Sequence, residues 1–385
     1  EHLWNVINRF TYKGKKEEWV TISLEEMMNI GIKNSNGQSK FRIPILNSPV
    51  EFIKKDISID PYTLGCLIGD GTLCAHSLYF TTNDTEILNY FTLPENYDIH
   101  KQLGENYNYR LTTQDRKPSL NKYLKELGLY GTKSHNKFIP ELYKYNSLEI
   151  RLEILRGLLD TDGDIGQHPD GTTRIQFNST SLRLIEDVIE IVNSLGGITT
   201  KPRVDKTHKK GNKSYFKNQV ITNNYDCYRI NIILPLSLNP FKLKRKADLF
   251  KNPTSLYRTI RKIELIGNKE AQCILVDSPS HLYLTDNFIV THNTLNNSVL
   301  ILDEFQNATL SQVYTALSRL GKGTKIIVTG DMSQCDLPKK TDSGFDFFKK
   351  LETENVPGVK IITLKGNHRH ELVDHIAKIY QEYKD

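Results

Sequence analysis

Hydrophobic and polar positions divide the chain into stretches of different texture. In 1–52, the short runs WVTISL at 19–24 and FRIPIL at 41–46 predict β-strands. The second stretch, 53–250, mixes helical and strand patterns, and a third, 255–293, returns to short β-like runs. The chain therefore passes from a β-rich segment into an α+β segment and back again.

The last stretch, 294–385, has a different character. Two apolar runs, Val299–Leu302 and Lys325–Thr329, lie among helical segments. Continuous apolar runs of this length are typical of parallel strands that are covered on both faces. The pattern predicts buried strands in an α/β half-domain.

The middle stretch is internally duplicated. Its first half opens at Asp60-Pro61, an N-cap followed by proline at the first helical position, and this apolar helix ends at Gly69-Asp70-Gly71. The second half opens at Asn146-Ser147, and its helix ends at Asp160-Thr161-Asp162-Gly163. Strands, a helix and further strands follow in each half, so we expect two similar α+β subunits.

The two opening helices carry matching glycines and aspartates. Gly65 and Gly157 stand in mid-helix, where glycine costs roughly 1 kcal/mol relative to alanine. That cost is explained if the helices touch backbone to backbone, which would bring Asp70 and Asp162 together at one end. Paired carboxylates repel each other unless a cation lies between them. Mg²⁺ prefers such oxygen ligands, and phosphodiester hydrolysis is chemistry that it supports.

These residues resemble the LAGLIDADG homing endonucleases over about 53–250. Two helix motifs separated by 162 − 70 = 92 residues, with Leu127–Pro140 resembling the family's intervening lysine motif, make the resemblance specific. It implies a duplicated α+β endonuclease domain with Asp70 and Asp162 as catalytic metal ligands and Lys137 near the active site. It also implies a saddle of strands along the major groove of double-stranded DNA. For a single Asp-Gly pair, a helix that runs into a turn is the alternative.

Alternating strands support DNA binding. Arg174, Gln176 and Asn178 share one face of a predicted strand, and Arg229 and Asn231 share one face of another. Arginine, glutamine and asparagine are side chains that contact base edges. An ordinary solvated sheet face is the alternative, and these strands alone do not decide between the two.

A basic segment, 201–217, carries seven Lys/Arg residues against one acid, Asp205. It includes Lys209 and Lys210, which we expect to contact DNA phosphates. Taken alone, the segment fits a solvated charge run better.

A second kind of chemistry is indicated around residue 293. Asn293 can attack its own carbonyl through its side-chain amide and break the chain after itself. The neighbouring His292 can protonate the leaving amine. The hydroxyl of Thr294 can hold an acyl group as an ester. Alone, this tetrapeptide signals little.

The context of that tetrapeptide resembles an intein. The run from Cys273 to Asn293 resembles the two C-terminal intein blocks, and it places His281 where a histidine assists asparagine cyclisation. Glu1–Trp4 resembles the tail of the second N-terminal block, with His2 polarising the upstream scissile amide. The resemblance implies a β-rich Hint-type splicing domain, formed by 1–52 and 255–293, with the endonuclease inserted between its halves.

One departure from most inteins separates two splicing mechanisms. Cys273 stands where most inteins have aspartate, and with Trp4 and Thr291 it resembles the triplet of class 3 inteins. In that class the internal thiol attacks the N-terminal junction before transfer to the acceptor, here Thr294. An ordinary class 1 intein with an incidental cysteine is the alternative.

From Thr294 onward the chain resembles the PhoH family of ATPases. The apolar run that ends in Asp303-Glu304 resembles a Walker B strand, in which these residues hold Mg²⁺ and orient water. Asp331 and Gln334 lie in a segment that resembles a γ-phosphate-sensing strand end, and Arg369 belongs to a later family motif. The resemblance implies an ATP- and Mg²⁺-dependent, nucleic-acid-binding host that forms rings.

The chain begins at Glu1, and it contains no G-x-x-x-x-G-K-[ST] motif. We therefore expect a fragment whose P-loop and first intein block lie in a missing N-terminal segment. Such a fragment should not splice, because it lacks the N-terminal junction, but it retains the residues for cleavage after Asn293.

Net charge, cysteine content and the length of apolar runs limit the compartments and partners to be expected for this chain. The net charge of +6 permits nucleic-acid binding without demonstrating it. Five cysteines with no CxxC pair favour a reducing compartment. No apolar run reaches the length of a membrane span, and no secretory signal opens the chain. We expect the cytoplasm of a bacterium or phage-infected cell and no membrane partner.

Two rival interpretations stay open. A maturase-like LAGLIDADG protein would bind DNA without splicing or cutting, although the intact Asp70 and Asp162 argue against loss of cutting. A plain PhoH-like ATPase or helicase is disfavoured because the P-loop is absent.

Overall fold

The computed structural model describes most of the chain in two compact units. The first unit comprises Leu3–Glu270 and Ser278–His292, and the second comprises Asn293–Asp385 with Glu1–His2 and Ala271–Asp277. The described residues are 3–9, 18–73, 78–94, 96–113, 120–216, 219–251, 256–267, 282–292, 299–317, 323–339 and 343–363, with 376, 379, 382 and 383.

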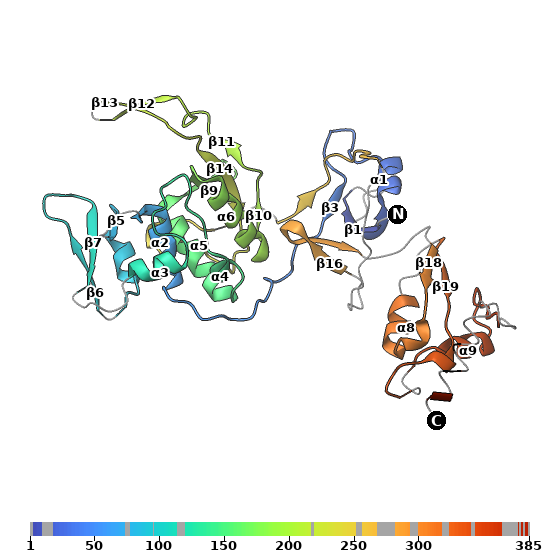
Figure 1. Ribbon diagram of the computed structural model, residues 1–385. Helices are drawn as coiled ribbons and strands as arrows, with labels where there is room; N and C mark the ends of the chain where they lie inside the picture. The colour runs from blue at the N-terminus through green and yellow to red at the C-terminus, as the bar shows by residue number, and fades with distance from the viewer. Residues whose placement is uncertain are drawn as a thin grey trace. The chain divides into compact units, whose positions relative to one another are not determined.

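Two helices form the centre of the α+β part of the first unit. Helix α2 (Pro61–Asp70) and helix α5 (Leu148–Asp162) lie side by side (Figure 1). The Asp60 side chain caps α2 by accepting a hydrogen bond from the Thr63 amide at 2.9 Å. Residues 61–68 of α2 are all buried, because the helix is enclosed by α5 and by the sheet that follows it.

The first half builds a four-stranded antiparallel sheet. Its strands have the order β4-β5-β7-β6. They are β4 (Gly71–Thr72), β5 (Leu78–Thr81), β6 (Tyr97–Lys101) and β7 (Asn108–Thr113), with the 3₁₀ helix η1 (Thr85–Tyr90) before β6 and α3 (Leu120–Glu126) after β7. Alternation places Leu78 and Phe80 in the core.

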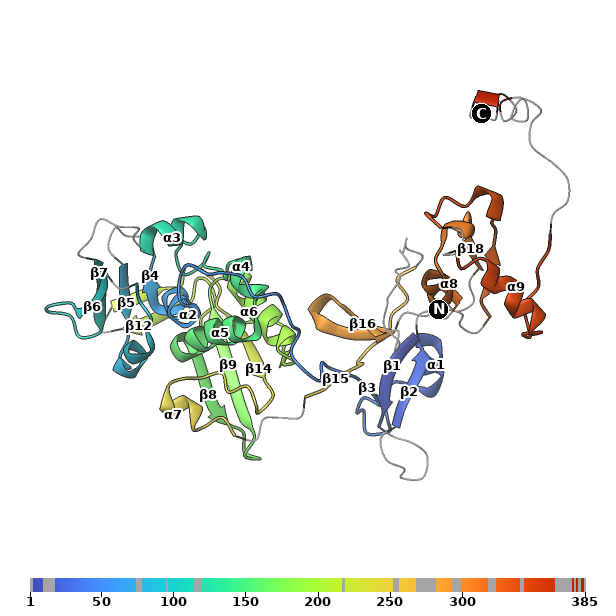
Figure 2. The ribbon, with the colours of Figure 1, turned by 90° about the horizontal axis from the view of Figure 1, so that it is seen from below.

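The second half repeats this arrangement with a longer sheet. The strands have the order β10-β14-β9-β8, and β11 also pairs with β14. They are β8 (Gly163–Gln167), β9 (Thr173–Ser179), β10 (Ile198–Thr199), β11 (Arg203–Val204) and β14 (Tyr228–Ile233), and the helices of this half are α4 (Glu141–Lys144), α6 (Leu182–Ser194) and α7 (Lys244–Ala247). Figure 2 shows α5 and α6 over one face of this sheet. A hairpin of β12 (Lys213–Phe216) and β13 (Gln219–Thr222) extends away from it (Figure 1).

The two halves share one hydrophobic core, which runs from Ile59 to Phe250. Residues from both central helices and both sheets contribute to it. Burial of apolar surface on this scale is the main stabilising term for such a domain. The duplicated halves are therefore one folded body.

A separate small sheet contains residues from both ends of the first unit. Its order is β15-β3-β1-β2, from β1 (Leu3–Asn8), β2 (Glu18–Ser23), β3 (Phe41–Ile43) and β15 (Arg258–Thr259). A capping box between Ser23 and Glu26 starts helix α1 (Leu24–Ile30) directly after β2. A strand from beyond residue 250 thus completes a sheet begun before residue 45. The predicted strand at 41–46 ends early, at Ile43, because Pro44 has no N–H to donate.

The second unit contains two parallel strands, as predicted, but they are not buried. Strands β18 (Val299–Leu302) and β19 (Lys325–Val328) pair in register. Val299 and Ile301 are each 64% exposed and Ile327 is 43% exposed, so the prediction of buried strands is wrong for the described residues. Parallel strands are buried only when neighbours cover both faces, and this pair has no further strand among the described residues. The helical elements are η3 (Phe305–Asn307), α8 (Leu310–Leu317), η4 (Met332–Gln334) and α9 (Asp346–Thr353).

A hairpin of β16 (Leu282–Thr285) and β17 (Ile289–His292), joined by the 3₁₀ turn η2 (Asp286–Phe288), closes the first unit. Strand β17 lies beside β1. Within the described ranges, no helix is both long enough and apolar enough to span a bilayer.

Candidate active site and nucleic-acid face

The two Asp-Gly pairs end the central helices in the same way. Asp70 is the last residue of α2, and Asp162 is the last residue of α5. Gly71 and Gly163 both have extended backbones with φ of −85°, and each lies so close over its helix that a Cβ would come within 2.4 Å of the carbonyl four residues earlier. Glycine is therefore required at these two positions because a side chain would clash with the helix, and not because the backbone adopts a left-handed turn.

The central helices touch backbone to backbone. A Cβ on Gly65 would lie 2.3 Å from a main-chain carbonyl oxygen of α5, and a Cβ on Gly157 would lie 2.2 Å from one of α2. This contact confirms the prediction made from the two mid-helix glycines. One turn further along, a Cβ on Gly69 would lie 3.3 Å from Asp162 Oδ2. The close approach thus places the Asp162 carboxylate against the end of α2, next to Asp70.

The electrostatics of this pair indicate a place for a cation. Burial, followed by the neighbouring Asp70 carboxylate, raises the pKa of Asp162 to about 7. Burial also raises the pKa of Asp70, and Lys137 and Lys246 partly oppose that shift. The described residues contain no cluster of three or more acidic, histidine or cysteine ligands. Two carboxylates fit Mg²⁺, which is commonly bound through one or two carboxylates together with waters and substrate phosphates.

Two buried lysines surround the aspartates. Lys137 is 7% exposed, and its Nζ donates to two carbonyls at the end of α2, both at 2.9 Å. Lys246 is 4% exposed, and its Nζ donates to three carbonyls at the end of α5, each at 2.7 Å. The acceptors are Gly69 O and Gly71 O for the first lysine, and Leu159 O, Asp160 O and Gly163 O for the second. Burial lowers the pKa of Lys246 to about 8.

Lys246 is a site residue that no sequence motif had indicated. The duplication was the available signal, because a lysine that serves the first helix end suggests another that serves the second. Spacing obscured this, since Lys137 follows Asp70 by 137 − 70 = 67 residues and Lys246 follows Asp162 by 246 − 162 = 84.

A buried carboxylate holds the segment that carries Lys246. Asp160 Oδ2 accepts hydrogen bonds from Tyr62 Oη at 2.8 Å and from the amides of Lys242 and Leu243 at 2.9 and 3.2 Å. Burial raises the pKa of Asp160. Asp160 therefore joins both central helices to the turn before α7 and so positions Lys246.

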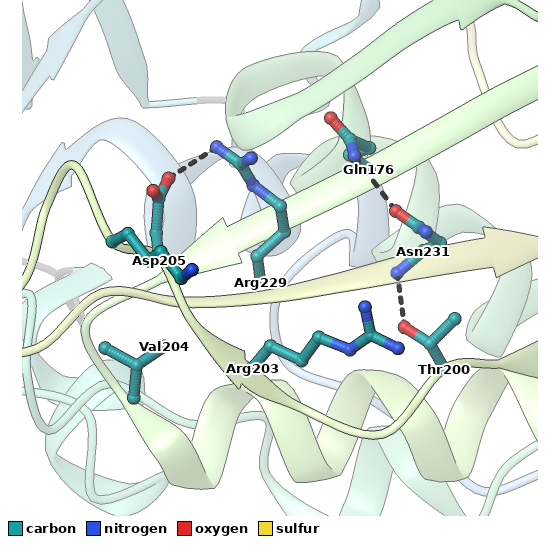
Figure 3. Close-up of a pocket in the computed structure, with 8 residues that line it drawn as sticks. Gln176, Thr200, Arg203, Val204, Asp205, Arg229 and Asn231 are labelled. Atoms are coloured by element: carbon teal, nitrogen blue, oxygen red, sulfur yellow. Dashed lines mark hydrogen bonds and ion pairs between the residues drawn. The ribbon is translucent and has the colours of Figure 1, made fainter.

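The polar residues predicted to bind DNA lie on one face of the second sheet. Arg229 lies opposite Asn178, and Asn231 lies opposite Gln176, across the β9–β14 ladder. Gln176 Nε2 donates to Asn231 Oδ1 at 3.0 Å (Figure 3). Arg174, also on β9, is paired with Asp164 of the neighbouring strand β8 at 3.5 Å. The other face of β9 and β14 is the core, which contains Ile175, Phe177, Ile230 and Ile232.

This polar face borders a hollow of about 370 Å³. Strands β9, β11 and β14 supply its lining together with residues that flank β11, as Figure 3 shows. The lining residues include Gln176, Arg203, Lys206, Arg229 and Asn231. The residues beyond β11 form a longer extension, on which Lys209 and Lys210 are exposed.

The acidic residues of the second unit come together at one strand edge. Asp303 follows β18, and its carboxylate accepts a hydrogen bond from the Thr329 hydroxyl just after β19. The buried Gln306 donates to Glu304 Oε2 at 2.7 Å and accepts from the Asp331 amide at 3.2 Å. Gln334 Nε2 donates to Asp331 Oδ2 at 3.1 Å. The carboxyl ends of parallel strands are the usual place for nucleotide sites in open α/β sheets. Arg369 lies outside the described residues.

Two family models match the chain in separate regions. A LAGLIDADG-like domain model matches residues 149–233, and a PhoH-like protein model matches residues 239–381. The chain combines a LAGLIDADG-like domain with a PhoH-like region. The LAGLIDADG-like match covers the second half of the duplicated fold from α5 to β14, and the PhoH-like match includes nearly all of the segment from Thr294 onward.

The curated relatives include two PhoH-like proteins and a replicative DNA helicase. A PhoH-like protein of Bacillus subtilis (strain 168) is 42% identical over 149 residues, which are 38% of this chain and 44% of that protein. A PhoH-like protein of Synechocystis is 32% identical over 174 residues, 42% of this chain and 50% of that protein. The replicative DNA helicase DnaB of Mycobacterium intracellulare is 29% identical over 250 residues, 62% of this chain and 36% of that protein. The chain thus spans half or less of the length of these relatives.

Among solved structures, a crystal structure of I-DmoI in complex with its target DNA covers 45% of this chain and 87% of its own. The two chains are 16% identical, with a TM-score of 0.27.

Most splicing candidates lie outside the described residues, namely His2, Cys273, His281, Asn293 and Thr294. Trp4 lies in β1, and Thr291 lies in β17, where it is 1% exposed. The backbone of His292 pairs with Leu282 in the β16–β17 ladder. The structure therefore places the strands of Trp4 and Thr291 beside each other, next to the LAGLIDADG-like domain in sequence.

Proposed function

We propose that the LAGLIDADG-like domain is a site-specific DNA endonuclease that works with Mg²⁺. The observation that carries the proposal is the convergence of Asp70 and Asp162 at the contact between two glycine-packed helices. Each carboxylate comes from a different half of a duplicated fold, and a polar sheet face lies in the same body.

The chain's own residues account for positioning and charge. Asp70 and Asp162 would hold the cation, which when bound supplies Lewis-acid stabilisation of the phosphoryl oxygens. Lys137 and Lys246 place fixed positive charge beside the same helix ends, where negative charge develops on the phosphate during hydrolysis. Their buried carbonyl contacts hold both ammonium groups in place, so little reorganisation is needed.

Cleavage of a defined duplex tests this proposal. The full chain is incubated with Mg²⁺ and DNA that spans the uninterrupted PhoH-like coding sequence at the residue 293/294 junction. We expect Asp70→Asn and Asp162→Asn to abolish cleavage while leaving DNA binding intact. Asp164→Asn is the matched control, because Asp164 is exposed and Arg174 is its one ion-pair partner among the residues that the structure describes. Binding without cleavage by the unmodified chain would instead favour a maturase-like DNA-binding protein.

As a second function, we infer that the flanking β-rich segments form an intein splicing domain. Strand β15 completes the sheet that β1–β3 begin, so the LAGLIDADG-like domain is inserted into one discontinuous β-fold. The position of the Thr291 strand beside that of Trp4 supports a shared splicing centre. We assign asparagine cyclisation to Asn293, with His281 and His292 assisting, and acyl acceptance to Thr294.

Protein chemistry tests splicing separately from DNA cleavage. Cleavage after Asn293 releases a fragment of 385 − 293 = 92 residues, which mass spectrometry detects. Asn293→Ala should abolish it, and Asn297→Ala should not. The first nucleophile is tested in a longer chain that includes the upstream splice junction and the first intein block before His2. In that chain, Cys273→Ala should block N-terminal cleavage if the Cys273 thiol is the first nucleophile. Normal N-terminal cleavage by that variant would support the class 1 mechanism.

For the PhoH-like region, we propose that Asp303, Glu304, Asp331 and Gln334, with Arg369, serve a Mg²⁺–ATP site in the complete host. The network around Gln306 supports this, because it joins the ends of two parallel strands. In the complete host, Asp303→Asn should abolish ATP hydrolysis and the exposed Asp336→Asn should not. Nucleic-acid binding and ring formation by the host are part of this proposal.

A further inference from the structure

One arginine on the polar sheet face is held along a single edge of its guanidinium group. Arg229 Nε donates to Asn178 Oδ1 at 2.8 Å. Arg229 Nη2 donates to Asp205 Oδ2 at 2.5 Å (Figure 3). Asn178 lies opposite on β9, and Asp205 follows β11 on the other side, so the guanidinium group is fixed from both neighbouring strands.

The anchoring carboxylate is itself held in place. Asp205 has a side chain that is only 7% exposed, and it accepts a hydrogen bond from the Thr207 amide at 3.0 Å. His208 Nδ1 lies 3.3 Å from the same carboxylate. The Thr207 amide is the main cause of a lowered Asp205 pKa, so the carboxylate is charged at neutral pH. Arg229 therefore has a rigid, charged partner.

The planar guanidinium group of Arg229 has two hydrogen-bonding edges, and only one of them is occupied by residues that the structure describes. Nε–H and one Nη2–H form the side edge, which Asn178 and Asp205 occupy. The end edge, formed by Nη1–H and the second Nη2–H, has no partner among the described residues. The Arg229 side chain is 41% exposed. Two parallel donors at a fixed position match the O6 and N7 acceptors of guanine in the major groove.

Charge distinguishes a base contact from a phosphate contact. Asp205 offsets the charge of Arg229, so the pair has little net attraction for a phosphate. The directional hydrogen bonds of the end edge are unaffected. Arg203, which lies opposite Arg229 on β11 and is exposed, has no such partner among the described residues and suits phosphate instead.

We propose that Arg229, held by Asn178 and Asp205, recognises a guanine in the DNA target and sets specificity at that position. The proposal rests on the proposed site-specific DNA binding and names one feature of the substrate. Asn178 and Asp205 act through Arg229 and are positioning residues.

Selection from a randomised duplex DNA library tests the proposal. The full chain binds the library with Ca²⁺ in place of Mg²⁺, and the bound sequences are compared with the input. One bidentate arginine–guanine contact corresponds to about 5- to 140-fold discrimination. Arg229→Lys retains the charge but not the paired donors, so this preference should fall to within about twofold at one position. Asp205→Asn should weaken the same preference several-fold without reducing affinity for mixed-sequence DNA. Lys209→Ala is the control, which should lower affinity for all sequences alike.

The outcomes separate the inference from the function on which it rests. Loss of guanine preference at one position in Arg229→Lys, with the rest of the profile unchanged, supports the assignment. A clear target profile that Arg229→Lys leaves unchanged overturns the assignment and keeps site-specific binding. An unmodified chain that binds DNA without any sequence preference overturns both. Thermal unfolding of each variant, expected to match the unmodified chain, excludes misfolding as the cause.

Discussion

Replacing Gly157 with alanine tests the backbone contact on which the active site depends. The added Cβ would lie 2.2 Å from Tyr62 O and 2.7 Å from Cys66 N, whereas real Cβ atoms essentially never approach within 3.0 Å. Both obstacles are backbone atoms, so the helices must separate by about 0.8 Å (3.0 − 2.2). A gap of about 0.5–1 Å removes roughly a quarter to a half of the dispersion energy of each contact.

The expected magnitude follows from two opposing terms. Alanine gains roughly 1 kcal/mol over glycine in helix propensity. Overpacking costs about 1–3 kcal/mol, and sometimes more when backbone must move. Because the clash involves two helices at the centre of the core, we expect a cost at the upper end of this range, so that the free energy of unfolding falls by about 2 kcal/mol (3 − 1). Movement of Asp162 relative to Asp70 by nearly 1 Å should also reduce the rate of DNA cleavage by about 100-fold.

Urea unfolding of the full chain, followed by cleavage kinetics, measures both effects. Gly166→Ala is the matched control, since the nearest atom to its new Cβ is the flexible Arg174 Nη2 at 3.3 Å. We expect this control to lie within about 0.5 kcal/mol of the unmodified chain. An unfolding midpoint and a cleavage rate for Gly157→Ala equal to those of the control would refute the backbone contact.

Three further predictions concern buried polar groups. The pKa of Asp162 rises from 3.8 to about 7 on folding, so the folded state binds an extra proton between these values. Without metal, the contribution of Asp162 to stability should therefore be fully present below about pH 4 and be lost as the pH rises through about 7. Urea midpoints in EDTA should show this slope. Asp162→Asn should make it shallower, with Asp70 and Asp160, whose pKa values are also raised, accounting for the rest, and an unchanged slope in that variant would contradict the assignment. Lys246→Met leaves three carbonyls at the end of α5 without their donor, so it should lower the free energy of unfolding by at least about 2 kcal/mol. Lys244 is exposed, and Lys244→Met, the control, should change the free energy of unfolding by less than about 0.5 kcal/mol. Arg151 is fully buried and donates to three oxygens, Asn146 O, Ser194 Oγ and Val50 O. Arg151→Met leaves these acceptors unpaired, so it should lower the thermal midpoint by an amount equivalent to roughly 2–4 kcal/mol. An unchanged midpoint would count against these contacts.

The sequence alone was sufficient for features that repeat with a short period. Gly65 and Gly157, at matching positions in two helices, predicted a close helix contact because glycine in mid-helix needs a reason. Alternation along β9 and β14 predicted which residues share the polar face, because successive strand residues point to opposite faces. The two Asp-Gly pairs, each at the end of an apolar helical run, predicted that Asp70 and Asp162 lie at matching helix ends.

The same local rules gave a wrong result for exposure in the second unit. Val299–Leu302 has the composition of a buried parallel strand and does form one half of a parallel pair. Its burial depends on neighbours that no pattern within the strand specifies. Composition therefore predicted the type of element and not its surroundings.

Only the tertiary structure decided which distant groups meet. Lys246 reaches the end of α5 from 84 residues away (246 − 162), and Asp160 binds the backbone that carries it. The contact between Asp205 and Arg229 depends on the path of the chain from β11 to β14, and β15 joins β3 only because the inserted domain returns the chain to its starting sheet. Local sequence determined the elements and their faces, because these depend on steric preferences and periodicity within a few residues. The tertiary structure determined the buried lysine, its carboxylate anchor and the fixed arginine, because these depend on the chain's path over tens of residues.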